Sequence, residues 1–252
     1  MADHGLEITA IQEENKKAEQ YGLSFLQASI LAERAYGTKH GKSDYSSFAF
    51  DPILYKKEHT ELSFFPLKNG KFVIAFQGSN GLLDWLDDLN CLLINKRVEH
   101  TSNKHVKISA GFALNYEPIK KTVFDLIDKY GVQNIILVGH SLGAANAVRA
   151  RFEISNKFGI DIPTIVFGEP NGGNDEYYDV VGKEKYWTIR NNRDIVCRVP
   201  FLSFGYGKPK RLYVDGGKPS KDEHWKWSFL FKLIGNTDDH YPTLYVKGCE
   251  KI

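Results

Sequence analysis

The segment Gly139-His140-Ser141-Leu142-Gly143 is the feature that most constrains how this chain can fold. The apolar run 134–138 before it is typical of a buried strand, and a helical pattern from Leu142 to about Phe158 follows it. A turn this short between strand and helix crowds its own backbone, and glycine relieves the crowding because it has no Cβ. The pattern therefore predicts a sharp turn that raises the Ser141 hydroxyl above the end of a sheet. The alternative is a serine that only caps the following helix.

Strand, G-x-S-x-G turn and helix in this order are typical of the nucleophile elbow of α/β-hydrolases. Other apolar runs predict strands at 62–66, 72–76, 163–167, 185–190 and 210–214, the first two joined by a hairpin turn at Asn69-Gly70. Helical spacing predicts helices over 8–36 and over 112–130 with Leu114 inward, while 38–60 is expected to be irregular. Pro118 is expected to kink the second helix or to mark its start. We expect one α/β domain over 1–252, a mainly parallel sheet with helices on both faces.

A serine nucleophile needs a histidine to take its proton and an acid to orient that histidine. In α/β-hydrolases these partners follow the serine in the order acid, then histidine, which leaves His224 and His240 as the base. Asp194 fits the acid because it follows the predicted strand 185–190 and a polar turn. The alternative acids are Asp175, which is the strongest of them, Asp179 and Asp215.

The negative oxygen of the transition state needs two hydrogen-bond donors. One is the backbone N–H of Leu142 within the predicted elbow. The other is expected from Ser79, because the segment 77–79 directly follows the predicted strand 72–76.

Five segments in order resemble the class 3 lipases, the fungal triacylglycerol lipase type: 75–79 with 84–89, 106–112, 138–145, 167–170 and 191–200. The resemblance covers about residues 20–245. It implies Ser141 as nucleophile, Asp194 as acid, and Ser79 with Leu142 as oxyanion donors. It favours His240 over His224 as the base, because the family's histidine often precedes an aromatic residue near the C-terminus. Gln77 stands where the family usually has arginine.

The same resemblance implies a lid over the serine at residues 80–94, with Leu82, Trp85 and Leu86 as lid or substrate-binding residues. Apolar residues in this segment share one helical face, and acidic residues keep the other face wet. The alternative is an amphipathic helix packed permanently on the core.

Composition limits the partners. The net charge of +2 and the lack of a basic stripe with aromatics argue against nucleic acid. The apolar runs are far shorter than the ~20 residues that cross a bilayer, and no Sec signal is visible at the N-terminus. The odd cysteine count, three, suggests reduced thiols. We expect a cytoplasmic protein or one exported by a non-Sec route, with neither metal nor cofactor, and the oligomeric state stays open.

The expected function is hydrolysis of lipid esters, that of an acylglycerol lipase, through an acyl-enzyme on Ser141, with transient contact with a membrane or lipid interface. Phospholipase A1 or another membrane-lipid acyl hydrolase is the first alternative, and the same triad also suits a thioesterase or protein deacylase. A catalytically silent hydrolase fold that binds lipid or protein is the alternative of another class.

Overall fold

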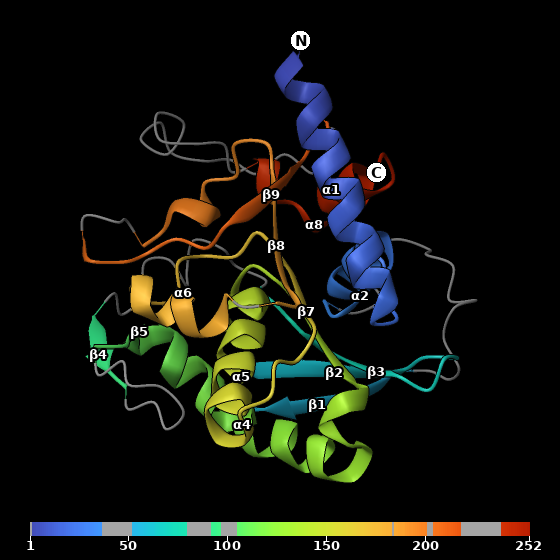
Figure 1. The fold of residues 1–252 in the computed structure, drawn as a ribbon. Helices are drawn as coiled ribbons and strands as arrows, with labels where there is room; N and C mark the ends of the chain where they lie inside the picture. Colours follow the sequence, from blue (N-terminus) through green and yellow to red (C-terminus); the bar gives the residue numbers. More distant parts are fainter. Residues whose placement is uncertain are drawn as a thin grey trace.

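A seven-stranded sheet forms the centre of the molecule (Figure 1). The structure is a computed structural model that describes residues 2–36, 52–79, 92–96, 105–182, 184–200, 204–217 and 238–252. The strands of the sheet are β1 (Ile53–Lys57), β2 (Thr60–Pro66), β3 (Phe72–Phe76), β6 (Ile135–His140), β7 (Thr164–Phe167), β8 (Tyr186–Asn191) and β9 (Arg211–Val214), and they lie side by side in this order. The first three are antiparallel, and every pair from β3 to β9 is parallel. The sheet is therefore mainly parallel, as predicted.

Helices cover both faces of the sheet, which gives the α/β-hydrolase arrangement (Figure 1). One face carries α4 (Ala110–Tyr130), α5 (Leu142–Phe158) and α6 (Asp175–Val181), and the other carries α1 (Ala2–Gln20), α2 (Phe25–Arg34) and α8 (Pro242–Cys249). A separate two-stranded ribbon consists of β4 (Leu93–Asn95) and β5 (Lys107–Ser109).

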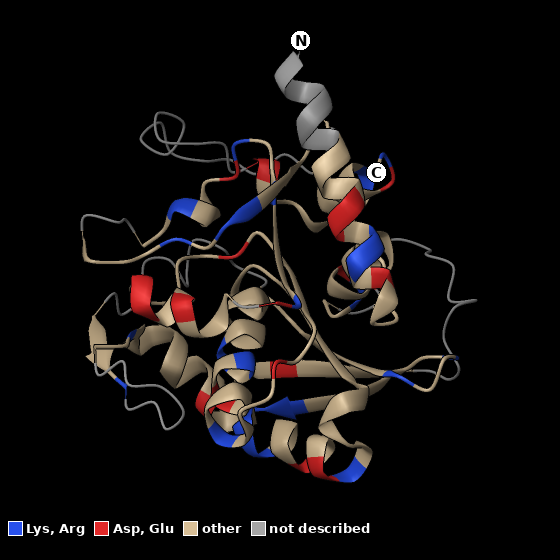
Figure 2. Ribbon diagram, viewed as in Figure 1, with Lys and Arg blue, Asp and Glu red and all other residues tan. Residues whose placement is uncertain are grey.

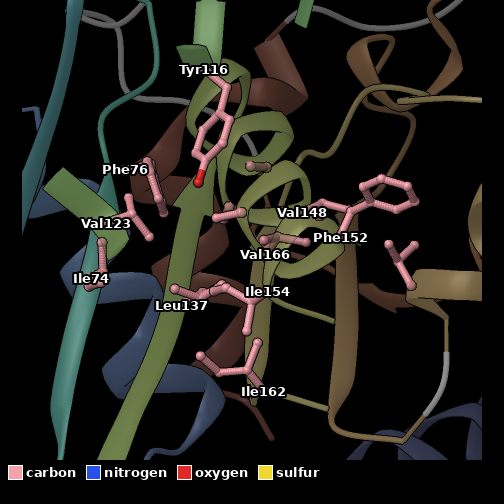
Figure 3. Close-up of a cluster of buried hydrophobic side chains, with 14 of the residues drawn as sticks. Ile74, Phe76, Tyr116, Val123, Leu137, Val148, Phe152, Ile154, Ile162 and Val166 are labelled. Carbon is pink, nitrogen blue, oxygen red and sulfur yellow. The ribbon is translucent and has the colours of Figure 1, made fainter. Parts of the chain in front are cut away.

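Side chains of the central strands alternate between the two faces, because successive residues of a strand point in opposite directions. Ile74 and Leu137 pack toward α4 and α5 (Figure 3), whereas Val73, Ile136 and Val138 pack toward α2 and α8. This two-sided burial explains why the run 134–138 reads as continuously apolar rather than alternating.

The predicted single helix over 8–36 is wrong, because the structure has two helices there. Gly22 has φ +106°, a conformation that ends α1 and that glycine adopts without a steric penalty. Ser24 then begins α2 with a capping box: its hydroxyl accepts from the Gln27 N–H, and the Gln27 side chain accepts from the Ser24 N–H.

The expectation of an irregular chain at 38–60 is wrong in its last part, where β1 pairs with β2 as an edge strand. The predicted helix over 112–130 exists as α4 but begins at Ala110, so Pro118 lies inside the helix and does not start it. Leu114 is exposed rather than inward, because it lies on the face of α4 that points away from the sheet.

The helices α6 and α8 and both strands of the ribbon, β4 and β5, were not predicted. Asp175, the strongest of the alternative acids, lies in the first turn of α6, which Asn174 caps by accepting from the Tyr177 N–H. The last two residues of the expected lid segment 80–94, Leu93 and Ile94, lie in the strand β4 rather than in a helix.

Positive and negative side chains are mixed over the described elements, as Figure 2 shows. Within the same part of the chain, no helix combines the length and the apolar character that a bilayer crossing needs.

Candidate active site

The carboxyl ends of the parallel strands bring the predicted site residues to one edge of the sheet. Ser141 follows β6, the loop 77–79 follows β3, Gly168 follows β7 and Asp194 follows β8. Neighbouring parallel strands end at the same edge, and open α/β sheets bind their ligands there.

The turn at Ser141 is as tight as the sequence predicts. Ser141 has φ 60° and ψ −127°, a strained backbone for a residue with a side chain. A Cβ on Gly139 would lie 2.2 Å from the Gly143 carbonyl oxygen, and one on Gly143 would lie 2.2 Å from the Phe76 carbonyl oxygen. The two glycines thus let the chain reverse and let α5 approach β3. The Ser141 side chain makes no capping hydrogen bond to α5, so the capping alternative is wrong.

A buried acid–histidine pair lies at the same edge. Asp194 Oδ2 lies 2.7 Å from His240 Nδ1, across 46 residues of sequence. The Tyr245 hydroxyl donates to the same oxygen at 2.5 Å, and the Val196 N–H donates to Asp194 Oδ1 at 2.8 Å. Together with the Cys197 thiol, which donates to Oδ2 at 3.8 Å, these donors fix the orientation of the carboxylate.

The other candidate acids lie elsewhere. Asp175 and Asp179 are exposed on α6, and Asp215 is exposed beyond β9, where it accepts from the Gly217 N–H and the Asn192 amide. The alternative base, His224, lies outside the described residues.

Burial raises the pKa of the Asp194 carboxyl, but the charge of His240 and the hydrogen bonds from His240, Tyr245 and Val196 outweigh it. The net effect lowers this pKa from the ordinary value of 3.8. The carboxylate therefore stays ionised, which keeps the proton of the imidazole on Nδ1.

The contact between the serine and the histidine is not formed. His240 Nε2 is buried and has no hydrogen-bond partner among the described residues. The phenol of Tyr36, two residues beyond the end of α2, lies 2.8 Å from His140 Nδ1. Burial raises the pKa of this phenol, and a hydrogen bond from the Ser141 hydroxyl partly opposes the rise. The ring of His140 packs against that of His240, with centroids 4.5 Å apart and the ring planes tilted by 31°, so the elbow histidine is packed inside the site.

Gly168 makes room for the acid–histidine pair. Its φ is +59°, and a Cβ there would lie 2.7 Å from His240 Cε1 and 3.1 Å from Asp194 Oδ2. Tyr36, Tyr245 and this role of Gly168 were missed in the sequence. In the sequence, only the glycine of the segment 167–170 pointed to any of these roles. The neighbours of a tyrosine in sequence do not indicate that it contacts residues far away in the chain.

The two predicted oxyanion donors follow the ends of β3 and β6, which are neighbouring strands of the sheet. Leu142 is the first residue of α5, and an N–H at that position has no acceptor within its own helix. Ser79 is the last described residue of the loop after β3. Gln77, oriented with its amide nitrogen toward two acceptors, donates to Glu61 Oε2 at 2.8 Å and to the Ala35 carbonyl at 3.2 Å. A neutral amide therefore ties this loop to β2 and α2.

Comparison with known proteins decides the family. The sequence model of lipase (class 3) matches residues 73–204, more than half of the chain. The chain belongs to the class 3 lipase family. It is 30% identical over 191 residues to a secreted mono- and diacylglycerol lipase, LIP4, of Malassezia restricta, a match that covers 69% of this chain and 63% of that protein. It is 28% identical over 148 residues to the chloroplastic phospholipase A(1) DAD1 of Arabidopsis thaliana, covering 51% of this chain and 33% of that protein.

Solved lipases share the fold. The triacylglyceride lipase of Rhizomucor miehei matches with a TM-score of 0.63 at 18% identity, over 94% of this chain and 97% of that one. A triacylglycerol lipase of Penicillium expansum matches with a TM-score of 0.58 at 21% identity, over 79% and 81% of the two chains.

Two further expectations for this class 3 lipase chain concern the lid and metals. Leu82, Trp85 and Leu86 lie outside the described residues, as does most of the expected lid at 80–94. The described part of the chain contains no group of three or more histidine, cysteine, aspartate or glutamate side chains placed to hold a metal ion.

The lowered pKa of Asp194 predicts an acid-dependent stability. Because the folded value lies below the unfolded one, the unfolded chain binds more protons in acid, and the stabilisation present at higher pH is lost as the pH falls through the folded value. We expect the melting temperature to fall between about pH 5 and about pH 3, and to fall less for Asp194→Asn. Thermal melts of both proteins measure this, and identical acid dependence would show that Asp194 contributes none of it.

Proposed function

We propose that the chain is a serine carboxylic-ester hydrolase that acts on lipid esters, as an acylglycerol lipase does. The observation that carries this proposal is the buried Asp194–His240 pair, at 2.7 Å, beside a strained serine turn at one edge of the sheet. The family membership supports it, as does the relative that is a mono- and diacylglycerol lipase. A solved triacylglycerol lipase with this fold (TM-score 0.58) has a catalytic centre formed by a serine protease triad.

In the proposed mechanism, Ser141 Oγ attacks the acyl carbonyl carbon while its proton passes to His240 Nε2. Asp194 stabilises the imidazolium, and the N–H groups of Leu142 and Ser79 bind the oxyanion. Collapse of the tetrahedral intermediate breaks the ester C–O bond, and His240 gives its proton to the departing alcohol. Water, deprotonated by His240, then attacks the acyl-enzyme, and the proton returns to Ser141 as the fatty acid leaves.

The geometry of His240 suits the role of base. Its Nδ1 faces the Asp194 carboxylate, so the neutral ring carries its proton there and leaves a lone pair on Nε2. Because Nε2 is bonded to no described residue, this lone pair is available to the nucleophile.

The substrate that we propose is an acylglycerol, reached by transient contact with a lipid surface through the segment 80–94, with Leu82, Trp85 and Leu86 on its apolar face. A membrane phospholipid is the second candidate, because Arabidopsis relatives are phospholipases A1, one of them 37% identical over 115 residues. The compartment, cytoplasmic or reached by a non-Sec route, stays a prediction.

A fluorophosphonate probe tests the proposal, because it attaches covalently to an activated serine. We expect the probe to label the wild-type protein at Ser141, and Ser141→Ala to lose labelling together with at least ~10³-fold of its activity on monoolein and p-nitrophenyl butyrate. Ser155→Ala, on the same helix, is the matched control and should keep both.

The outcomes separate the candidate functions. A higher specific activity on phosphatidylcholine vesicles than on monoolein would favour the phospholipase. Folded wild-type protein that takes no label and hydrolyses no activated ester would favour the silent binding module and end the proposal.

A further inference from the structure

Two hydrogen bonds join the turn Asp238–His240, which carries the proposed base, to the segment after β8, which carries the proposed acid. Asn191, the last residue of β8, donates from its amide Nδ2 to the Asp239 carbonyl oxygen at 2.9 Å. The Arg193 backbone N–H donates to Asp239 Oδ2 at 3.0 Å. These bonds span 48 and 46 residues of sequence, and the proposed mechanism uses neither of them. We call the two bonds the clasp.

The amide of Asn191 is fully buried and is bonded at both ends. Its Oδ1 accepts from the Gly216 N–H at 2.8 Å, while its Nδ2 donates to the Asp239 carbonyl. A backbone N–H can only donate and a carbonyl can only accept, so a reversed amide would satisfy neither neighbour. The position therefore needs a side chain that both donates and accepts.

The same amide connects three parts of the chain. Gly216 follows β9 and lies directly against α8, since a Cβ on Gly216 would lie 2.0 Å from the Leu244 carbonyl oxygen. The backbone carbonyl of Asn191 accepts from the Asp194 N–H at 3.0 Å, which closes the turn that carries the acid. Asn191 therefore contacts the turn of the acid, the turn of the base and the segment after β9.

The turn of the base depends on contacts with its surroundings. It is a single 3₁₀ turn of three residues, Asp238–His240. The backbone bond that follows it, from the Tyr241 N–H to the Asp238 carbonyl, is long at 3.5 Å, and hydrogen bonds of this length are weak. A displacement of about 1 Å in a catalytic group can cost ~10² in rate, so the bonds that hold this turn bear on the proposed reaction.

We propose that Asn191 and Asp239 are positioning residues, which set the place of His240 relative to Asp194 through the clasp. The proposal rests on the proposed function, because the pair that the clasp positions is the acid and the base of that function. Both residues act through His240. Without the clasp the turn moves, and the imidazole loses its alignment with the Asp194 carboxylate.

The first test is Asn191→Ala, which removes the bonds at both ends of the amide. We expect kcat on p-nitrophenyl butyrate to fall about 10²-fold, with KM within about twofold of the wild type, because the base is misplaced while substrate binding is not changed. The matched control is Asp215→Ala. Asp215 also accepts two hydrogen bonds, from the Asn192 amide and the Gly217 N–H, but on the exposed side and away from the clasp. This control should keep the wild-type kcat.

The second test uses Asp239, and it leaves the Asn191 amide intact. Asp239→Ala removes the acceptor of the Arg193 N–H, and we expect kcat to fall about tenfold, the effect of one hydrogen bond. Asp239→Asn keeps an oxygen at that place and should recover most of the lost kcat. This pair of variants decides the proposal by itself if Asn191→Ala does not fold.

Proton NMR supplies a readout that a purely structural role would not move. The proton between Asp194 Oδ2 and His240 Nδ1 should give a far-downfield signal in the wild type. We expect Asn191→Ala and Asp239→Ala to shift or lose this signal, and Asp215→Ala to keep it.

The clasp and the proposed function can fail separately. Folded Asn191→Ala or Asp239→Ala protein with the wild-type kcat and signal, whatever its melting temperature, would overturn the role of the clasp, and so would a loss confined to KM. Wild-type protein that takes no fluorophosphonate label, while Asn191→Ala still loses the signal, would instead end the proposed function and leave the clasp in place.

Discussion

Asp194→Asn is expected to lower kcat about 10⁴-fold while the protein stays folded, as this exchange does in serine protease triads. Asp194 Oδ1 accepts from the Val196 backbone N–H, which cannot turn away, so the single oxygen of asparagine is held there. The amide nitrogen then takes the place of Oδ2 and faces His240 Nδ1. The imidazole must move its proton to Nε2, where it can no longer accept one from Ser141.

The matched controls are Asp175→Asn and Asp179→Asn, which change the same chemical group on the exposed face of α6. Both should keep full kcat on p-nitrophenyl butyrate. A large loss in Asp175→Asn with an active Asp194→Asn protein would show that the acid is wrongly assigned.

Gly168→Ala is expected to cost both activity and stability. The new Cβ would lie 2.7 Å from His240 Cε1 and 2.9 Å from His240 Nδ1, so the imidazole must move away from Asp194. Misplacing a catalytic group by about 1 Å can cost ~10² in rate, and we expect at least that loss in kcat. Alanine at φ +59° adds backbone strain of about 1–2 kcal/mol.

Gly70→Ala separates the two effects. Gly70 has φ +79° in the hairpin between β2 and β3, and nothing lies within 4 Å of a Cβ placed there. The same backbone strain should lower the free energy of unfolding of this variant by about 1–2 kcal/mol, as measured in denaturant, while its activity stays at the wild-type level. If Gly168→Ala also keeps full activity, the contact with His240 does not position the base.

The wrong prediction of a single helix over 8–36 could have been avoided, because the sequence itself marks the break. The break between α1 and α2 is marked locally by Gly22 and by Ser24 with Gln27 three residues later, a capping signature. The exposure of Leu114 could not be predicted from the sequence, because helical spacing alone does not say which turn of α4 contacts the sheet.

The elbow was determined by the sequence itself, because its cause is local. Gly139, Ser141 and Gly143 are close in the chain, and the crowding that requires the glycines arises from their own backbone. The central strands could also be predicted from local sequence. Strands that are buried on both faces consist of continuous apolar runs such as 134–138.

Only the tertiary structure shows that Asp194 pairs with His240 at the same end of the sheet as that serine. The order of residues alone left two histidines and four acids open, and the preference for His240 came from family resemblance. The order of the parallel strands, the turn Asp238–His240 and α8 bring Asp194, His240 and Tyr245 together, and the residues after α2 bring Tyr36 to the elbow. Such contacts join residues distant in the chain, so they depend on how the layers pack and leave no periodic trace in the sequence.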